Sequence, residues 1–298
     1  MDVTGDTIDL LFKGFNTKFN DFHQQIGTSW DKVAMKLQST GSEEVYGWLD
    51  DLPQIREWLG DRVIKQFRTA DYVIKNRKFE QTIRVSREDI EDDKLGLYEG
   101  RLRMMAHSAA MHPDELVYEL LNKGFEATGY DGQPFFDTDH IYYDENDVEQ
   151  SVSNMQAGTG PGWFLLDTAR PIKPMVFQER IPYTPQNLNS DSESHVFLRD
   201  EYLYGMRARV NAGFGLWQLA FGSKAVLTDA NYAAARASMQ ARRYNGGRIM
   251  GLTPTLLVVP PALESEARAL LVAERNAAGA TNVWANSAEL LVTPFLAA

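Results

Sequence analysis

The stretch FEQTIRVSREDIEDDKLGLYEGRLRMMAHSAAMHPDELVYELLNKG, residues 79–124, joins the clearest strand pattern of the chain to its longest helical pattern. Over residues 79–86 apolar and polar side chains mostly alternate, which predicts a strand with one mostly apolar face and one polar face. The apolar face is expected to carry Phe79, Gln81, Ile83 and Val85, and the polar face Glu80, Thr82, Arg84 and Ser86. Such a strand is expected to lie with one side on a core and the other partly exposed.

Directly after this strand the apolar spacing changes to three and four, which predicts a helix over residues 87–124. Ser86 with Asp89 resembles a capping box at its start. Pro113 lacks an amide hydrogen and clashes with the preceding turn, so we expect the helix to break or kink there and to restart at His112–Glu115. The apolar stripe consists of Ile90, Leu97, Leu102, Met105, Ala106, Ala109 and Ala110, continued by Leu116, Val117, Leu120 and Leu121.

Two further strand-like runs precede residue 79. They are Val63–Phe67 and Tyr72–Lys75, and Asn76–Lys78 suits a turn before the strand at 79–86. We therefore expect residues 62–86 to form an extended hairpin. A hairpin this charged on one side is only marginally stable alone, so it needs another surface to lie on.

The N-terminal residues 7–25 form an amphipathic helical pattern, with Thr4 or Asp6 as the expected cap. Its apolar stripe is Ile8, Leu11, Phe12, Phe15, Phe19 and Phe22. Two interpretations stay open: the helix docks on the core of its own chain, or it is an arm that docks on a neighbouring subunit. Residues 26–45 are mostly polar and resemble a linker.

The rest of the chain predicts a mixed α+β architecture. Residues 129–195 are rich in Gly, Pro, Asp and Asn, which indicates loops and short strands, whereas residues 199–221 are ambiguous. The other expected elements are a short helix from Pro53 to Gly60, a helix at 229–242 capped by Asp229, a strand at 255–259, a helix at 262–273 and a strand at 288–292.

Composition excludes several classes of protein. The chain has 298 residues, no cysteine and a formal net charge of −11, so disulfides and thiolate chemistry are excluded and a phosphate-binding nucleic-acid module is not indicated. No apolar run approaches the roughly 18 residues of a membrane span, and the acidic N-terminus does not resemble a secretory signal. The simplest compartment is the cytoplasm of a producing cell.

One segment resembles an enzyme site. Asp137, Asp139 and His140 lie within four residues and could hold a divalent metal for a hydrolase. The same pattern is typical of turns in which Asp side chains accept backbone amide hydrogens, and the sequence favours this structural interpretation. No phosphate-binding loop or hydrolase nucleophile elbow is present. We therefore predict no catalytic residue, no metal and no cofactor, and keep the metal-dependent hydrolase as the alternative.

Taken in order, many short segments resemble the major head subunit of Mu-like tailed bacteriophages. The resemblance covers essentially the whole chain. The segments that carry it are Tyr46–Leu49, Leu52–Pro53, Arg56–Arg62, Phe79–Glu80, Val85–Asp93, His112–Pro113, Tyr130–His140, Arg170–Pro174, Trp217–Ala220, Pro254–Pro261, Asn282–Trp284 and Leu290–Val292.

That family is similar to capsid proteins of the Hong Kong 97 (HK97) fold, and the resemblance implies an N-terminal arm, an extended hairpin loop, a spine helix, and peripheral and axial domains. The expected division is an arm at 1–45, the start of the peripheral domain at 46–61, the hairpin loop at 62–86, the spine at 87–129, a mainly axial part at 130–255, and a return to both domains at 256–298.

The implied function is a non-catalytic major capsid protein that forms an icosahedral head around the phage genome. A shell protein of a cellular nanocompartment or gene-transfer particle is a second alternative. The implied partners are copies of the chain in hexamers and pentamers, a separate scaffold protein, the portal and non-specifically contacted DNA, with a decoration protein left open and no membrane. Such a chain would assemble in the host cytoplasm and end in the virion. The residues predicted to serve assembly are Phe12, Phe15, Phe19, Phe22, Tyr72, Ile74, Phe79 and Ile83.

Overall fold

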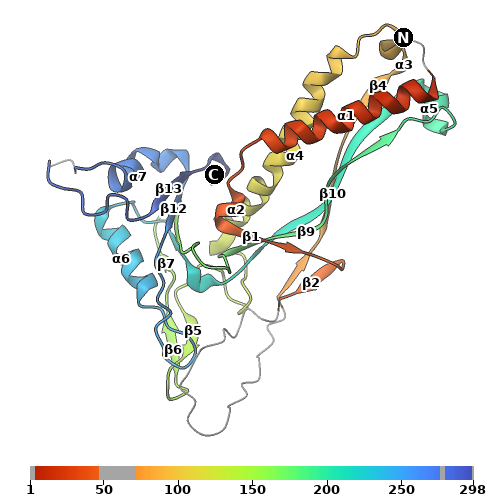
Figure 1. Ribbon diagram of the computed structural model, residues 1–298. Helices are drawn as coiled ribbons and strands as arrows, with labels where there is room; N and C mark the ends of the chain where they lie inside the picture. The colour runs from red at the N-terminus through yellow and green to blue at the C-terminus, as the bar shows by residue number, and fades with distance from the viewer. Residues whose placement is uncertain (1–3, 47–71, 276–278, 297–298) are drawn as a thin grey trace.

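The computed structural model describes residues 4–46, 72–275 and 279–296. These residues form a wide body from which a long blade projects (Figure 1). The blade consists of the helices α1 (Gly5–Gln25) and α4 (Gly96–Asn122) on a sheet that contains β4 (Arg77–Ser86), β9 (Met175–Leu188) and β10 (Glu201–Phe214). The chain is thus a mixed α and β protein, as its sequence predicts.

The blade sheet has the strand order β1-β9-β10-β4, with β1 at Ala34–Gln38. β10 is antiparallel to both β9 and β4, and β1 is parallel to the first residues of β9. Side chains alternate along β10 between buried and partly exposed positions, because successive residues of a strand point to opposite faces. The face that carries Tyr202, Tyr204 and Met206 packs against α1 and α4, so the helices cover only one side of the sheet.

β4 confirms the predicted two-faced strand. In the register with β10, Val85 pairs with Tyr202 and Ile83 with Tyr204, on the face covered by the helices. Arg84 and Glu80 lie on the opposite, open face and are exposed.

The spine is interrupted at a different place from the predicted one. A short helix, α3 (Arg87–Glu91), ends in a turn in which Asp93 has a φ of 55°, and α4 then runs without a break through Pro113. The prediction of a break at Pro113 is therefore wrong. Apolar residues on both sides of the proline are buried, Leu102 and Met105 in one cluster and Leu116 and Leu121 in another. This packing keeps the residues on both sides of Pro113 helical despite the missing hydrogen bond.

The pairing predicted within the hairpin is also wrong for its described residues. β3 (Val73–Lys75) pairs with β2 (Glu43–Val45), whereas β4 pairs with β10. Only Asn76 separates β3 from β4, and one residue cannot fold the second strand back on the first. The Asn76 amide donates to Ser39 Oγ and to the Gly41 carbonyl, and accepts from Gln178 Nε2. The predicted strand Val63–Phe67 and the predicted helix at Pro53–Gly60 lie outside the described residues.

Residues 26–45 are more ordered than the predicted linker. They contain α2 (Trp30–Val33), β1 and β2. α2 is attached to the spine by Asp114, which is 3% exposed and accepts hydrogen bonds from the amides of Ser29 and Trp30. The conformation of residues 26–45 thus depends on buried residues elsewhere in the chain, such as Asp114, and not on the local sequence pattern.

The region of expected short strands contains β9, which with β10 is one of the two longest strands among the described residues. β9 has 14 residues and includes Pro182 and Pro185, which are unfavourable inside a sheet. β1 pairs only with Met175–Glu179, so the rest of β9 is an edge strand in which a missing amide hydrogen is tolerated. The ambiguous residues 199–221 form most of β10, the 3-10 turn η3 (Trp217–Leu219) and the start of β11 (Ala220–Ser223).

The body contains a sheet in the order β13-β12-β8-β11-β7. Its strands β8 (Trp163–Leu166) and β12 (Leu256–Val259) are buried at every position, because both sheet faces are covered. One face packs on α6 (Asp229–Gln240) and α7 (Glu264–Leu271), and the other joins the cluster at the end of α4. Its remaining strands are β7 (Met155–Gln156) and β13 (Glu289–Val292), and β5 (His140–Tyr143) and β6 (Glu149–Val152) form a separate hairpin.

Several predicted boundaries are confirmed. Thr4 caps α1, and β12 and β13 lie where apolar runs predict strands. The cap of α6 is Thr228, whose side chain accepts from the Asn231 amide, and not the expected Asp229. The expected helix at 262–273 is divided into η4 (Pro261–Leu263) and α7. The smaller elements are η2 (Lys123–Phe125), α5 (Ser194–Arg199) and η5 (Pro294–Leu296).

Candidate assembly surfaces

The phenylalanine stripe of α1 lies on its own chain. Phe12 and Phe19 are 1% exposed and Phe15 is 5% exposed. Phe15 meets the Tyr204 ring edge-on at 5.6 Å between centroids, and Phe12 lies 6.0 Å from the same ring. This burial also raises the pKa of Tyr204 above its ordinary value. The interpretation of α1 as a helix docked on its own core therefore holds for these three side chains.

The last predicted assembly residue of α1 is more accessible. Phe22 is half-buried, and the guanidinium of Arg103 on α4 lies over its ring at 4.1 Å. Lys18 and Glu99 form an exposed ion pair between the same two helices at 3.2 Å. Exposed pairs of this kind add little stability, so the buried aromatic rings hold α1 in place.

Tyr72 and Ile74 belong to a closed junction that we call the neck, formed by β2, β3, Tyr46 and Tyr72. The Tyr46 amide donates to the Tyr72 carbonyl at 2.9 Å, so residues 46 and 72 lie side by side. The Tyr72 hydroxyl accepts from the Phe214 amide at 2.8 Å, and Ile74 is 3% exposed against Gly213. Burial raises the pKa of both Tyr46 and Tyr72 to about 12. The two ends of segment 47–71 are thereby fixed at one point of the sheet.

Phe79 and Ile83 lie under the helices. Both are partly exposed, and the Phe79 ring meets the His112 ring at 4.2 Å. His112 Nδ1 lies 2.6 Å from the Tyr183 hydroxyl. Burial lowers the pKa of His112 and raises that of Tyr183. The structure therefore places Phe79 against the spine helix, whereas Ile74 lies at the neck.

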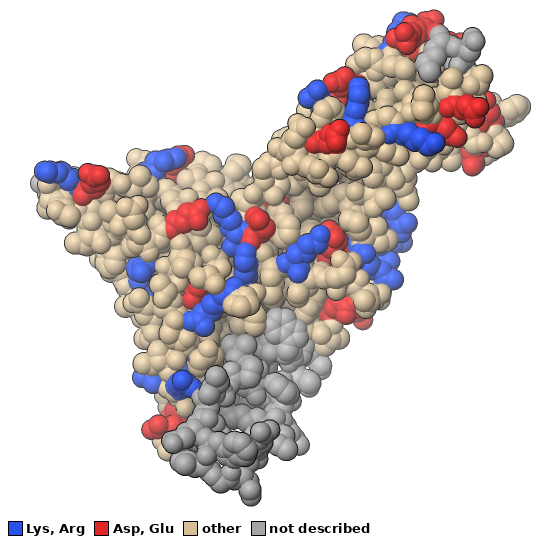
Figure 2. Space-filling view, in the orientation of Figure 1, with Lys and Arg blue, Asp and Glu red and all other residues tan. Residues whose placement is uncertain are grey.

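Charged side chains of both signs are interspersed over the face shown in Figure 2. Blue Lys and Arg atoms lie along the flank of the sheet below α1 and in a narrow row down the middle of the face, and red Asp and Glu atoms lie beside both. This distribution agrees with the excess of 41 acidic over 30 basic residues.

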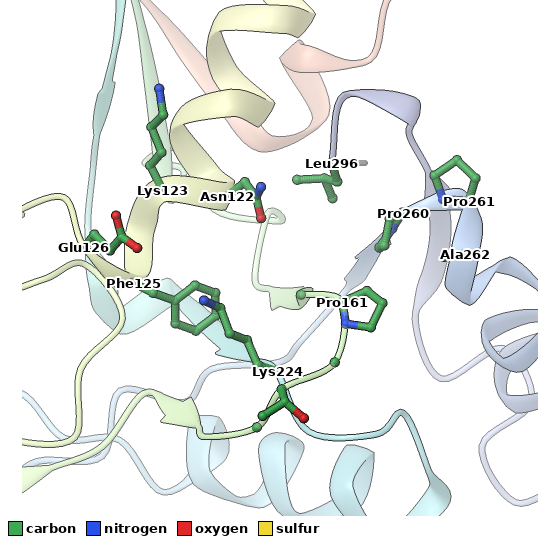
Figure 3. Close-up of a pocket in the computed structure, with 14 residues that line it drawn as sticks. Asn122, Lys123, Phe125, Glu126, Pro161, Lys224, Pro260, Pro261, Ala262 and Leu296 are labelled. Atoms are coloured by element: carbon green, nitrogen blue, oxygen red, sulfur yellow. The ribbon is translucent and has the colours of Figure 1, made fainter. Parts of the chain in front are cut away.

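A pocket of about 700 Å³ lies between the end of α4 and the Pro260–Pro261 turn (Figure 3). Its lining includes Phe125, Pro161 and Leu296, and the Lys224 ammonium lies 4.7 Å from the centre of the Phe125 ring. Histidine and paired carboxylates are the side chains that most often act as general acids and bases in enzymes. The lining of this pocket contains no histidine and only one carboxylate, Glu126. The sequence did not predict this pocket, because its lining comes from segments that are far apart along the chain.

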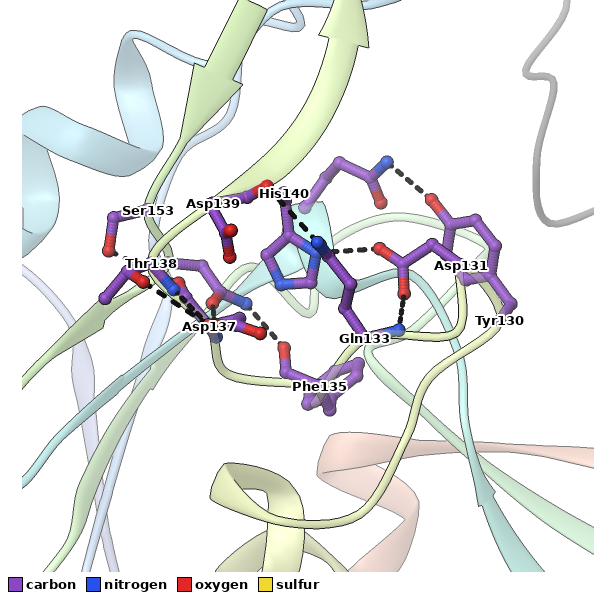
Figure 4. Close-up of polar contacts among 11 residues, drawn as sticks. Tyr130, Asp131, Gln133, Phe135, Asp137, Thr138, Asp139, His140 and Ser153 are labelled. Carbon is purple, nitrogen blue, oxygen red and sulfur yellow. Dashed lines mark hydrogen bonds and ion pairs between the residues drawn. The ribbon is translucent and has the colours of Figure 1, made fainter.

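The Asp137–His140 segment is a structural turn beside a buried histidine (Figure 4). His140 is 0% exposed, its Nδ1 lies 2.7 Å from Asp131 Oδ2, and its ring stacks on Trp217 at 4.0 Å. Asp137 accepts from the Thr138 amide at 2.6 Å, as the turn interpretation predicts. Within the ranges that the structure describes, no three His, Asp or Glu side chains are placed to share a metal ion. The imidazole is therefore paired with Asp131, outside the predicted triplet.

Comparison with known proteins identifies relatives along nearly the whole chain. A family model described as Mu-like prophage major head subunit gpT matches residues 8–296. The Mu-like prophage FluMu major head subunit of Haemophilus influenzae is 36% identical over 92% of each chain. The major capsid protein of Escherichia phage Mu is 37% identical over 95% of each chain. These relatives favour a phage head over a cellular nanocompartment.

Solved structures give the same result. A chain of the procapsid of bacteriophage JBD30 is 39% identical, with a TM-score of 0.88 over 98% of this chain and 100% of that one. A chain of the JBD30 capsid is 31% identical, with a TM-score of 0.79 over 91% and 92%. In the described residues, no helix combines the length and the apolar character needed to cross a membrane. The chain belongs to the Mu-like prophage major head subunit gpT family and is a major capsid protein that forms the shell of a phage head.

Proposed function

We propose that copies of the chain assemble as hexamers and pentamers into an icosahedral head, and that segment 47–71 and the blade make the contacts between subunits. The observation that carries this proposal is the neck. Residues 46 and 72 are hydrogen-bonded to each other, so the 25 residues between them leave and re-enter the fold at one point. A segment held in this way is suited to reach a neighbour without disturbing the core of its own chain.

The proposed division of labour keeps the arm, loop and spine. The arm is residues 1–45, the peripheral domain starts at 46–61, the loop is 62–86 and the spine is 87–129. β9 and most of β10 run along the blade beside α4, so we assign them to the peripheral domain. The axial part is then limited to the body within residues 130–255, and residues 256–298 contribute to both.

The assembly roles of the eight predicted residues remain part of this proposal, with three modes of action. Phe12, Phe15 and Phe19 act indirectly, because they hold α1 on the blade of the same chain. Tyr72 and Ile74 act by closing the neck. Phe22, Phe79 and Ile83 retain exposed area that a neighbouring subunit could cover.

The proposed partners beyond the chain itself are a scaffold protein during assembly, the portal, and DNA contacted without sequence preference. A JBD30 capsid decorated with minor capsid protein trimers contains a chain that is 32% identical to this one, which supports a decoration protein as a further partner. We infer assembly in the host cytoplasm.

Shortening segment 47–71, which spans the start of the peripheral domain and the beginning of the loop, tests the proposal. Residues 48–70 are replaced by a linker of about four Gly and Ser residues, which is long enough to join the adjacent ends of the neck. We expect folded, soluble subunits that form no shells, as measured by circular dichroism, sedimentation and negative-stain electron microscopy. The control removes Glu145 and Asn146 from the exposed turn between β5 and β6. Normal shells from the chain with the shortened segment would contradict the proposal.

We also propose that the chain catalyses no reaction. In the alternative, Asp139 would be a metal ligand of a hydrolase, although its neighbour His140 is buried against Trp217. The test is metal analysis of the purified protein together with Asp139→Ala. We expect no stoichiometric metal and normal shells from the variant. A bound metal that this substitution removes would restore the enzyme hypothesis.

A further inference from the structure

The body contains a buried arginine whose charge meets no acidic side chain in the described residues. Arg242 follows the end of α6, and it is 2% exposed. Its Nη2 donates to the Ser153 carbonyl at a long 3.4 Å, and that carbonyl also accepts from the Ser238 hydroxyl. The Nε and Nη1 of Arg242 have no hydrogen-bond acceptor in the protein. The guanidinium is therefore almost unpartnered inside the fold.

Two other arginines of the body show how the same fold satisfies a guanidinium. Arg236, on α6 itself, donates to one hydroxyl and two backbone carbonyls at 3.0–3.2 Å. Arg170 donates to two carbonyls and forms an ion pair with Asp167 at 3.1 Å. Both side chains are only partly buried. The fold thus supplies acceptors to arginines that it buries less, whereas the more deeply buried Arg242 has a single long hydrogen bond.

The charge of Arg242 is costly in this environment. Protein interiors solvate ions poorly, so buried charges are normally paired. Burial lowers the pKa of Arg242 to about 9, and the guanidinium therefore still carries its proton at pH 7. The guanidinium carbon lies 5.2 Å from the centre of the Trp217 ring, in a cation–π contact. A ring quadrupole attracts a cation less than a full negative charge does, so the contact does not replace a counter-ion.

A second unpartnered polar group lies on the same indole. His140 stacks on Trp217 at 4.0 Å, with 8° between the planes. The Nδ1 of His140 lies 2.7 Å from Asp131 Oδ2, which holds the ring in place. Its Nε2 is buried and has no hydrogen-bond partner in the protein. Two basic side chains with unused nitrogen atoms thus contact one tryptophan.

The chemistry of Arg242 restricts what can bind there. A guanidinium only donates hydrogen bonds, so its partner has to accept them, and its positive charge repels metal ions. Water accepts hydrogen bonds but leaves the charge uncompensated. The carboxylate of another chain would have to enter the core, because Arg242 is 2% exposed. A small inorganic anion both accepts hydrogen bonds and supplies the missing negative charge.

Such an ion would lie where three separate segments of the body meet. Arg242 belongs to the turn after α6, Ser153 to the turn after β6, and Trp217 to η3. The β5–β6 hairpin ends at this point, and its sheet contains only these two strands. A counter-ion would therefore strengthen the attachment of the hairpin to the body.

We infer that the body holds a small inorganic anion, such as chloride, bound to the guanidinium of Arg242 beside Trp217. The ion neutralises the arginine and ties the turn after β6 to the end of α6. The inference concerns the interior of one subunit, so it does not depend on the proposed contacts between subunits. Any agent that binds only the folded chain raises its stability, and this linkage makes the site measurable.

Thermal melting in two salts tests the site. The purified full chain is melted in sodium chloride and in sodium gluconate at equal ionic strength, because gluconate is a bulky organic ion that a buried site excludes. We expect the melting temperature to rise by about 3 °C for each tenfold increase of chloride above its dissociation constant. Arg242→Met should melt at the same temperature in both salts. The control Arg243→Met, at the exposed next position, should keep the chloride dependence.

Fluorescence quenching locates the ion and remains usable if Arg242→Met fails to fold. Bromide resembles chloride and quenches indole fluorescence on contact. Because Trp217 is 3% exposed, bromide in bulk solvent seldom reaches it. We therefore expect a saturable quenching component in the wild-type chain that chloride reverses by competition. This component should be absent from Trp217→Phe and from Arg242→Met, and should persist in Arg243→Met.

The outcomes are distinguishable. Equal melting in chloride and gluconate, with no saturable quenching of the wild-type chain, would show that water solvates the guanidinium and would overturn the inference. Saturable quenching that persists in Arg242→Met would place the ion elsewhere, which also contradicts the inference. A chloride effect on melting without saturable quenching would separate the ion from Trp217 and would be a further refutation. None of these results affects the shell-assembly test of segment 47–71.

Discussion

The two sides of the blade use different chemistry. On one side, the aromatic stripe of α1 is buried against Tyr202 and Tyr204 of the same chain. On the other side, the open face of β4 and β10 presents a basic cluster of Lys78, Arg207 and Arg209, which form no ion pair in the described part of the chain. The sequence leaves open whether the stripe docks on its own chain or on a neighbour, and it predicts that the polar side of β4 is partly exposed.

The difference indicates which surface is available for assembly. Buried aromatic rings contribute their hydrophobic free energy within the subunit, so they cannot contribute it again to a contact. Unpaired charges on a flat face destabilise the lone subunit slightly and can favour one partner over others. The blade therefore separates folding, on the helix side, from the proposed subunit recognition, on the sheet side. Two substitutions and a change of pH test this separation.

The largest expected effect is on the helix side. Phe12→Ala removes a ring that is 1% exposed, and should lower the free energy of unfolding by about 3–5 kcal/mol. Urea denaturation followed by circular dichroism measures this loss. Leu10→Ala is the matched control, because Leu10 lies on the same helix and is 70% exposed. A Phe12→Ala subunit with normal stability that cannot assemble would instead make the stripe a contact between subunits.

A smaller loss is expected where α2 is attached to the spine. Asp114 accepts hydrogen bonds from the Ser29 amide, the Ser29 hydroxyl and the Trp30 amide at 2.8–3.1 Å. Asp114→Asn removes the charge and one accepting oxygen, which should cost about 2 kcal/mol of unfolding free energy in the same urea assay. Glu115→Gln, at an exposed neighbouring position, should change stability little. Equal stability of both variants would mean that α2 is held by its apolar contacts and by the Tyr118 hydroxyl, which donates to the Ser29 carbonyl, without a contribution from the Asp114 charge.

Local patterns predicted the parts of the blade that depend on local physics. The alternation of Phe79 to Ser86 defined the two faces of β4, and the spacing of Phe12, Phe15 and Phe19 defined the buried side of α1. In both cases the period of the element decides which side chains share a face. The ordered family segments then identified the phage head protein, which single patterns did not.

Features that depend on distant partners could not be predicted in this way. The spine continues through Pro113 because both flanking turns are buried, and β9 accommodates Pro182 because β1 ends early. The basic cluster also escaped detection, since Lys78 and Arg209 are 131 positions apart and meet only through the register of β4 and β10. The spacing of apolar residues shows that a strand has two different faces, but it does not show which other strand pairs with it and shares each face.

The smallest expected effect concerns pH at the base of α1. His23 stacks on Phe19 and lies 6.1 Å from Tyr183, while His112 contacts Tyr183 and Phe79. Burial lowers the pKa of both imidazoles below 6.5; for His112, Glu115 opposes this shift and Arg77 adds to it. The folded state thus favours neutral rings, and the unfolded state binds more protons as the pH falls through 6.5.

The stability that depends on neutral His23 and His112 is therefore complete above pH 6.5 and is lost as the solution becomes more acidic. We expect the urea midpoint of the subunit to fall between pH 7.5 and about pH 5.5, before most carboxylates titrate. A variant with His23→Gln and His112→Gln should show a flatter pH dependence over this range, whereas His107→Gln, at an exposed position of α4, should not. Because both imidazoles lie on the helix side, the basic cluster of the sheet side takes no part in this loss. An unchanged slope in the double variant would show that other groups govern the acid sensitivity of the blade.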